Sequence, residues 1–205
     1  VGSEMCIRDS AFYVSAQQTV QCDYMNRAYA MHPYTRGEGF TRSALSLKNG
    51  GRMVFILPDQ GVSVDTLFAS PQKAASLFLG VDQGTGKVVF QIPKFSFGSK
   101  LNLKKTLHAM GVRCAFESDQ ADFSGMTQDQ AFFSQILQET HIAIDEKGVE
   151  AAAFTKLDYA GTAAPNEKEA YMILNRPFLY GIVSDGVLLF AGCLLYTSPS
   201  PRDRT

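Results

Sequence analysis

Residues 142–165 place the strongest constraint on the fold of this 205-residue chain. An apolar run enters a charged stretch that ends at Gly148, and neither a clear helix nor a clear strand follows before Asn175. Intervals of this length between structural elements are usually functional or disordered. Glycine and serine are scarce here, so the composition differs from that of a flexible linker. The interval therefore needs a structural explanation of its own.

The first part of this interval alternates with a period of two residues. One face carries no charge and consists of Val149, Ala151, Ala153, Thr155, Leu157 and Tyr159. The other face carries three charges and consists of Glu150, Ala152, Phe154, Lys156, Asp158 and Ala160. Such alternation is typical of a strand with one buried face. Two interpretations follow: an edge strand that leads into a surface loop, or a loop that can become a strand.

Two hairpins are predicted elsewhere in the chain. Asn49-Gly50-Gly51 separates the runs 44–48 and 52–57, and Ser184-Asp185-Gly186 separates 177–183 and 187–191. Asn-Gly and Asp-Gly steps accept the positive φ angles of tight turns. The run MVFIL at 53–57 is apolar throughout, which predicts a strand covered on both faces. Both arms of the second hairpin are almost wholly apolar, so we expect both in the middle of a core.

The remaining elements alternate between helix and strand signals. Ser63 and Ser70 are predicted to cap two helices. The pattern predicts one strand over 87–97 and a short helix over 103–110. The first half of 132–144 fits either a strand or a helix that passes into a strand. The sequence therefore indicates a mixed fold in which β structure dominates.

Composition and charge exclude several classes of partner. Apolar residues make up 45% of the chain, charged residues make up 19%, and the formal net charge is −1. This balance supplies no basic surface for nucleic acid and no polybasic patch for anionic membranes. The apolar runs are also far shorter than a bilayer span. We expect neither a nucleic-acid partner nor a membrane partner.

No motif predicts a metal site, a cofactor or an active site. His32, His108 and His141 lack metal-ligand spacing, and no serine lies in a GxSxG nucleophile motif. The segment GTGK at 84–87 lacks the glycine spacing and the hydroxyl residue of a phosphate loop, and we expect a turn there. We therefore expect no metal, no cofactor and no enzymatic activity.

The two ends of the chain differ from the rest. Residues 1–10 and 193–205 are interpreted as non-native segments, because they lack periodicity and the second is rich in serine, proline and arginine. Residues 1–10 show no secretory signal. Cys22 and Cys114 lie outside these ends and are interpreted as free thiols, since no paired spacing indicates a disulfide framework. The sequence alone leaves the compartment unknown.

Several motifs, in sequence order, resemble the serpin family of serine protease inhibitors. The hinge of the serpin reactive loop is matched by Glu146, Lys147, Gly148, Val149, Glu150, Ala151, Ala152 and Ala153. The family signature is matched by MILNRPFLYGI at 172–182, which contains Asn175, Arg176, Pro177 and Phe178. FILP at 55–58, IPKF at 92–95 and ADFSGM at 121–126 are similar to further serpin segments. Residues 11–192 are thus identified as the C-terminal portion of a serpin of bacterial type, with a reactive loop at about 146–168.

The resemblance implies an α+β fold with three β-sheets and several helices. It also implies an endopeptidase inhibitor that acts as a suicide substrate. A serine or cysteine protease cuts the reactive loop and forms an acyl-enzyme, and the cut loop then inserts into the main sheet as a strand. The implied protein is a monomer, is extracellular and is not an enzyme. We expect the N-terminal helices and the strand beside which the loop inserts to lie outside this sequence, so the isolated chain should not inhibit.

The position of the reactive bond depends on the end from which the loop is counted. Counting forward from Glu146 by the usual inhibitor length places the bond between Thr162 and Ala163, which we prefer because insertion fixes that length. Counting back from Asn175 places it near Asn166 or Lys168. The small residues around Thr162 would suit an elastase-like or subtilisin-like protease.

Two residues depart from the common inhibitor pattern. Val149 stands where Thr or Ser is common, but it needs no hydrogen-bond partner and is compatible with insertion. Phe154 stands where a small residue is usual and should slow insertion.

The main alternative is a non-inhibitory serpin that acts as a binding protein or chaperone. The missing nucleophile motif argues against a further alternative, a hydrolytic enzyme.

Overall fold

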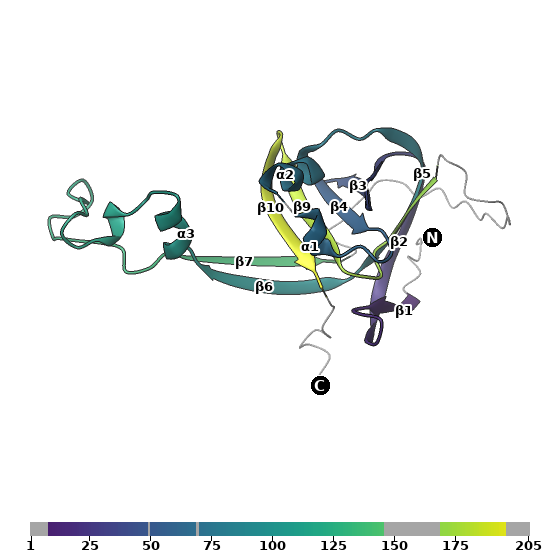
Figure 1. Cartoon of the computed structure of the whole chain (residues 1–205), viewed down its shortest axis with the longest axis horizontal. Coiled ribbons are helices and arrows are strands. Elements are labelled where there is room, and N and C mark those ends of the chain that lie inside the picture. The colour runs from purple at the N-terminus through teal and green to yellow at the C-terminus, as the bar shows by residue number, and fades with distance from the viewer. Residues whose placement is uncertain (1–7, 49, 69, 146–168, 196–205) are drawn as a thin grey trace. The chain divides into compact units, whose positions relative to one another are not determined.

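The computed structural model describes residues 8–48, 50–68, 70–145 and 169–195. The strands are β1 (Arg8–Tyr13), β2 (Thr19–Gly37), β3 (Phe40–Ser46), β4 (Arg52–Pro58), β5 (Gly84–Pro93), β6 (Phe95–Asn102), β7 (Leu137–Ile144), β8 (Glu169–Ile173), β9 (Phe178–Ser184) and β10 (Val187–Leu194). The helices are α1 (Val64–Leu67), α2 (Pro71–Leu79), α3 (Lys104–Ala109) and the 3-10 helix η1 (Cys114–Phe116). Figure 1 labels these elements except β8 and η1. The mixed class with dominant β structure is confirmed.

Eight of these strands form one sheet. Its order is β10-β9-β4-β3-β2-β5-β8, and β1 pairs with β2 beside this path. β8 joins β5 in parallel, whereas the other pairs of this sheet are antiparallel. β6 and β7 form a separate two-stranded sheet. Ser96–Ala143 make up one compact unit of the chain, and the described residues before and after them make up another.

The long strand β2 connects two groups of strands. Its residues 24–29 and 32–34 pair with β5, and its last four residues, from Tyr34, pair with β3. Between Tyr29 and His32 the pairing register shifts, which is the mark of a β-bulge. A bulge bends a strand and increases its twist, so β2 can serve both groups. Within the described residues, β2 therefore makes the two groups parts of one sheet.

Two capped helices cover one face of β4 and β9. Ser63 Oγ accepts a hydrogen bond from the Asp65 amide at 3.3 Å, and Ser70 Oγ accepts one from the Lys73 amide at 3.2 Å. Both predicted caps are thus confirmed. The resulting core cluster contains Val54, Ile56, Val64, Leu67, Leu77, Phe78, Leu179 and Val183. A Cβ at Gly181 would lie 2.7 Å from Cδ1 of Phe78, so only glycine permits this close approach.

Aromatic rings fill the opposite face of β4 and β9. Phe55 and Phe178 are fully buried with ring centroids 6.3 Å apart, and Phe95 lies 6.2 Å from Phe178 and 5.2 Å from Tyr180. The prediction that the MVFIL strand is covered on both faces is confirmed. For the second hairpin only β9 is central. β10 is an edge strand, and Leu189 on it is 64% exposed.

Three local expectations were wrong. The strand predicted over 87–97 is divided into β5 and β6, because Pro93 lacks an amide donor and the Lys94 amide donates to Asp23 O at 2.8 Å. The segment 84–87 begins β5 and does not form a turn. In 132–144, strand structure begins only at Leu137, and the residues before it form neither helix nor strand.

The described ends of the chain take part in strand pairing. Ser10 pairs with Cys22 in β1 and β2, and Cys193 pairs with Leu179 in β10 and β9. The interpretation of residues 1–10 and 193–205 as non-native segments stays a prediction. Among the helices described here, none has the length and apolar character needed to cross a bilayer.

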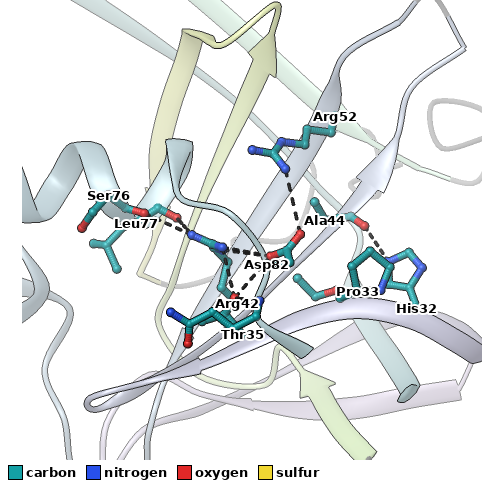
Figure 2. A network of polar contacts seen from close by, with 11 residues as sticks. His32, Pro33, Thr35, Arg42, Ala44, Arg52, Ser76, Leu77 and Asp82 are labelled. Atoms are coloured by element: carbon teal, nitrogen blue, oxygen red, sulfur yellow. Dashed lines mark hydrogen bonds and ion pairs between the residues drawn. The ribbon is translucent and has the colours of Figure 1, made fainter. Parts of the chain in front are cut away.

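A buried ion pair fixes the start of β5 against β2 and β3 (Figure 2). The side chain of Arg42 is 5% exposed, and its Nη2 lies 2.9 Å from Oδ1 of Asp82. The same guanidinium donates to the main-chain oxygens of Ser76 and Leu77 at 3.1 and 3.3 Å, at the end of α2. Thr35 Oγ1 accepts from Arg42 Nη2 at 3.1 Å and from the Gln83 amide at 3.2 Å. The network therefore ties α2 and the approach to β5 to the sheet.

We predict that Asp82→Ala lowers the free energy of unfolding by about 3 kcal/mol, because it leaves the buried Arg42 guanidinium without its counter-charge. Urea unfolding of the chain, followed by circular dichroism, measures the change. The control is Glu139→Ala, which breaks the Lys100–Glu139 pair, whose side chains are 61% and 67% exposed. This control should cost less than about 1 kcal/mol. Equal losses for the two variants would contradict the importance assigned to the network.

Candidate functional site: the strands that border residues 146–168

The predicted reactive loop lies outside the described residues. This applies to the hinge at 146–153 and to the bond candidates Thr162 and Ala163. The structure describes the chain again from Glu169. The candidate site is therefore built from its two bordering strands, β7 and β8, and from the link between β8 and β9.

β7 is the strand before the loop. Ile142 and Ile144 are buried, with exposed Ala143 between them, so the end of β7 has one buried face. Across the two-stranded sheet, Ser96 Oγ of β6 lies 3.2 Å from Nε2 of His141. The upstream border of the loop is thus a strand that pairs with β6.

β8 is the strand after the loop, and it lies at the edge of the eight-stranded sheet. It pairs in parallel with β5, from Lys87 opposite Glu169 to Gln91 opposite Ile173. Ala170 and Met172 are buried, whereas Tyr171 is 47% exposed. The alternation of buried and exposed residues is that of a strand with one face in the core.

Three side chains converge on Glu169, the first residue of β8. Lys87 Nζ of β5 lies 3.4 Å from Oε1 of Glu169, and the Tyr171 hydroxyl donates to Oε2 at 2.8 Å. Arg36 of β2 donates through Nη2 to the main-chain oxygen of Glu169. The hydrogen bond from Tyr171 and the charge of Lys87 lower the pKa of the Glu169 carboxyl from its ordinary value, and partial desolvation opposes them. We call Arg36, Lys87, Glu169 and Tyr171 the Glu169 cluster.

The link between β8 and β9 contains three of the four signature residues, and the fourth, Phe178, begins β9. The Leu174 amide donates to Gln91 O at 2.9 Å, and Asn175 O accepts from the Tyr13 amide at 2.7 Å. Arg176 donates through Nε and Nη2 to Pro58 O, at 3.1 and 2.8 Å. Main-chain groups of β1, β4 and β5 therefore hold the link in place.

The signature residues contribute in different ways. Burial lowers the pKa of the Arg176 guanidinium from its ordinary value, and the negative charge of Asp59 opposes this effect. Pro177 is half-buried, and Phe178 is fully buried in the aromatic cluster. Arg176 therefore ties the link to the end of β4, and Phe178 anchors the start of β9 among the aromatic side chains.

The structure does not bring the three histidines together. His32 on β2 contacts Ala44 O at 2.7 Å, His108 on α3 packs against Phe116 with 5.0 Å between ring centroids, and His141 lies on β7. Within the described ranges, no group of three or more metal-ligating side chains lies close enough to hold a metal ion.

Burial raises the pKa of the Cys193 thiol to about 11, so this thiol is protonated at neutral pH and is a poor nucleophile.

Sequence reasoning missed the Glu169 cluster. Arg36 and Lys87 are separated from Glu169 by 133 and 82 positions in the chain. No local pattern relates positions so far apart. Two sequence signals bear on this cluster: the period-two alternation of β8 and the apolar alternation over 87–97. Taken together, they could have indicated two strands with opposite charges, on Lys87 and Glu169, that face each other.

Comparison with known proteins gives consistent results. Residues 3–197 match the family model described as serpin (serine protease inhibitor). The alpha-1-antitrypsin homolog of Cyprinus carpio is 34% identical over 185 residues, which are 88% of this chain and 48% of that protein. Serpin48 of the insect Tenebrio molitor has a TM-score of 0.72 at 28% identity, over 94% of this chain and 51% of the other. Human thyroxine-binding globulin has a TM-score of 0.72 at 25% identity, over 93% and 50%.

The chain spans about half the length of these relatives. The family match covers both bordering strands, the link between β8 and β9, and β9 itself. The fold agrees with the fold of the matched structures over nearly the whole chain. A bacterial-type origin stays a prediction. The chain belongs to the serpin family of serine protease inhibitors.

Proposed function

We propose that this chain is the loop-bearing part of an inhibitory serpin that acts as a suicide substrate. A target serine or cysteine protease cuts residues 146–168, and the upstream piece then inserts into the main sheet as a strand. The observation that carries the proposal is the charge-free face of residues 149–159, in an interval bordered by strands of two different sheets. Relatives named as an alpha-1-antitrypsin homolog and as plasminogen activator inhibitor 1 support the inhibitory reading.

The two borders explain how a cut can release the loop. β7 pairs with β6, and β8 pairs with β5, so residues 145–168 do not join two neighbouring strands of one hairpin. Cleavage between the borders therefore breaks neither strand pair. After cleavage, the upstream piece stays attached to β7 and the downstream piece stays attached to β8.

The chemistry on the inhibitor side needs only a peptide bond in reach of the protease. The protease nucleophile attacks the carbonyl carbon of Thr162, and the bond to the Ala163 nitrogen breaks as that nitrogen takes up a proton. Thr162 then forms an ester, or a thioester in a cysteine protease, with the enzyme. Insertion must follow before water hydrolyses this bond.

Insertion is favourable because an added strand gains main-chain hydrogen bonds along its length, and serpin loop insertion is itself a standard example of strand addition. At about 1 kcal/mol net for each bond, about a dozen bonds would contribute on the order of 10 kcal/mol. A charged side chain on the inserted buried face would oppose this gain, because burying an unpaired charge is costly.

A second candidate is a non-inhibitory serpin that acts as a binding protein. The structural likeness to thyroxine-binding globulin, which was solved in complex with thyroxine, favours this candidate. The two candidates differ in the fate of the protease. An inhibitor retains the protease as a covalent complex, whereas a binding protein is cut and releases an active protease.

One prediction of the proposed function concerns this covalent complex. The complete serpin domain, meaning this chain together with the half that its relatives carry in addition, should form a detergent-resistant complex with an elastase-like protease. Mass spectrometry of the released peptide should place the cut between Thr162 and Ala163. Cleavage after Lys156 or Lys168 would contradict this bond assignment, and cleavage without any complex would favour the binding protein.

Another prediction compares two neighbouring alanines. Ala153→Glu places a charge on the charge-free face, so we expect slower insertion and at least about a tenfold rise in the stoichiometry of inhibition. The control, Ala152→Glu, adds the same charge to the opposite face and should change the stoichiometry by less than about twofold. Titration of a fixed amount of protease measures both. An equal rise in the stoichiometry of inhibition for both variants would show that insertion does not distinguish the two faces.

A further inference from the structure

We propose that the Glu169 cluster positions the downstream end of the loop and that loss of the negative charge of Glu169 loosens β8 from β5. Arg36, Lys87 and Tyr171 are thus positioning residues for the loop. This inference rests on the proposed function for its biological meaning. Its physical content, charge-dependent attachment of one strand, can be measured without any protease.

The cluster joins three strands at the residue where the described chain resumes after the loop. Lys87 comes from β5, Arg36 comes from β2, and Tyr171 comes from β8 itself. They hold both the carboxylate and the main-chain oxygen of Glu169, with 3.4 Å from Lys87 Nζ to Oε1 and 2.8 Å from the Tyr171 hydroxyl to Oε2. Both the backbone position and the side-chain direction of Glu169 are therefore fixed.

β8 needs such contacts because it is a short edge strand. It has five residues, and among the described strands it pairs with β5 alone. Short edge elements open locally at a lower free energy than the rest of a fold. A single exposed ion pair contributes little in general, but here three donors converge on one residue at the start of the strand.

The effect should depend on pH in one direction. The charged and titratable groups that face Glu169 are Arg36 from β2, Lys87 from β5 and Tyr171 from β8. The pKa of Glu169 is lowered in the folded chain, so the contribution of its carboxylate is present at neutral pH. That contribution is lost as the pH falls through the lowered value.

The consequence for the proposed inhibitor concerns the leaving group of the protease reaction. When the loop is cut, the new amino terminus belongs to the piece attached to β8. With the Glu169 cluster intact, that piece stays on β5 while the upstream piece inserts with the acyl-enzyme. The two ends are thereby separated, and the amine cannot re-form the peptide bond.

Hydrogen–deuterium exchange of the 205-residue chain tests the proposal. The protection of the amides of residues 170–174 is compared in the unmodified chain and in Glu169→Gln, over about pH 7 to pH 3. We expect Glu169→Gln to exchange about three- to fivefold faster at pH 7, because it removes the charge. The unmodified chain should lose this protection of β8 only when the pH falls into the acid range. Glu169→Gln should show no such pH-dependent loss.

Two further variants make the result specific. Tyr171→Phe removes the hydrogen bond that contributes most to the lowered pKa, so the acid step should move to higher pH. Glu139→Gln removes one negative charge on β7 and should leave the exchange of β8 unchanged. In all variants the amides of β9 report whether the core stays folded.

Three results would overturn the proposal: equal protection of β8 in Glu169→Gln and the unmodified chain at pH 7, the same acid step in both, or an unshifted step in Tyr171→Phe. Failure of the covalent complex, with the exchange results as expected, would instead refute the inhibitor function alone.

Discussion

The parallel pairing of β8 with β5 is the constraint on which the geometry of the loop depends. β8 receives the chain from residues 146–168 and passes it to β9 through a link held by the main chains of β1, β4 and β5. β5 is itself fixed at its start by the Arg42–Asp82 network and at its end by the Lys94 amide. A displacement of β5 would therefore move the downstream border of the loop. The Arg42–Asp82 ion pair and the candidate site are therefore connected through β5.

Local signals in the sequence were sufficient for elements that short-range chemistry determines. The caps at Ser63 and Ser70 and the turn at Asp185-Gly186, with φ angles of 49° and 75°, need only neighbouring residues. The division of the strand over 87–97 was missed because β5 and β6 pair with different partners, and strand partners lie far away in sequence. β10 was misplaced for a related reason: its apolar composition resembles that of β9, but only β9 has strands on both sides.

In the candidate site, too, the sequence located some residues and missed others. The resemblance located the signature residues, and the structure explains two of them: Arg176 binds the end of β4, and Phe178 fills the aromatic core. The Glu169 cluster could not be predicted, because Arg36 and Lys87 are separated from Glu169 by 133 and 82 positions in the chain. The alternation of residues 149–159, in contrast, is a purely local property. It is where the physical case for insertion is strongest, since a charge-free face is what a strand needs to enter a core.

Thermal unfolding before and after a single cut tests the central claim, that residues 149–159 can join a β-sheet, most directly. The complete serpin domain is cut once within residues 154–168, and its melting temperature is compared with that of the intact domain by calorimetry. An added strand that contributes on the order of 10 kcal/mol should raise the melting temperature by at least about 10 °C. An unchanged or lower melting temperature would contradict insertion and, with it, the inhibitory mechanism.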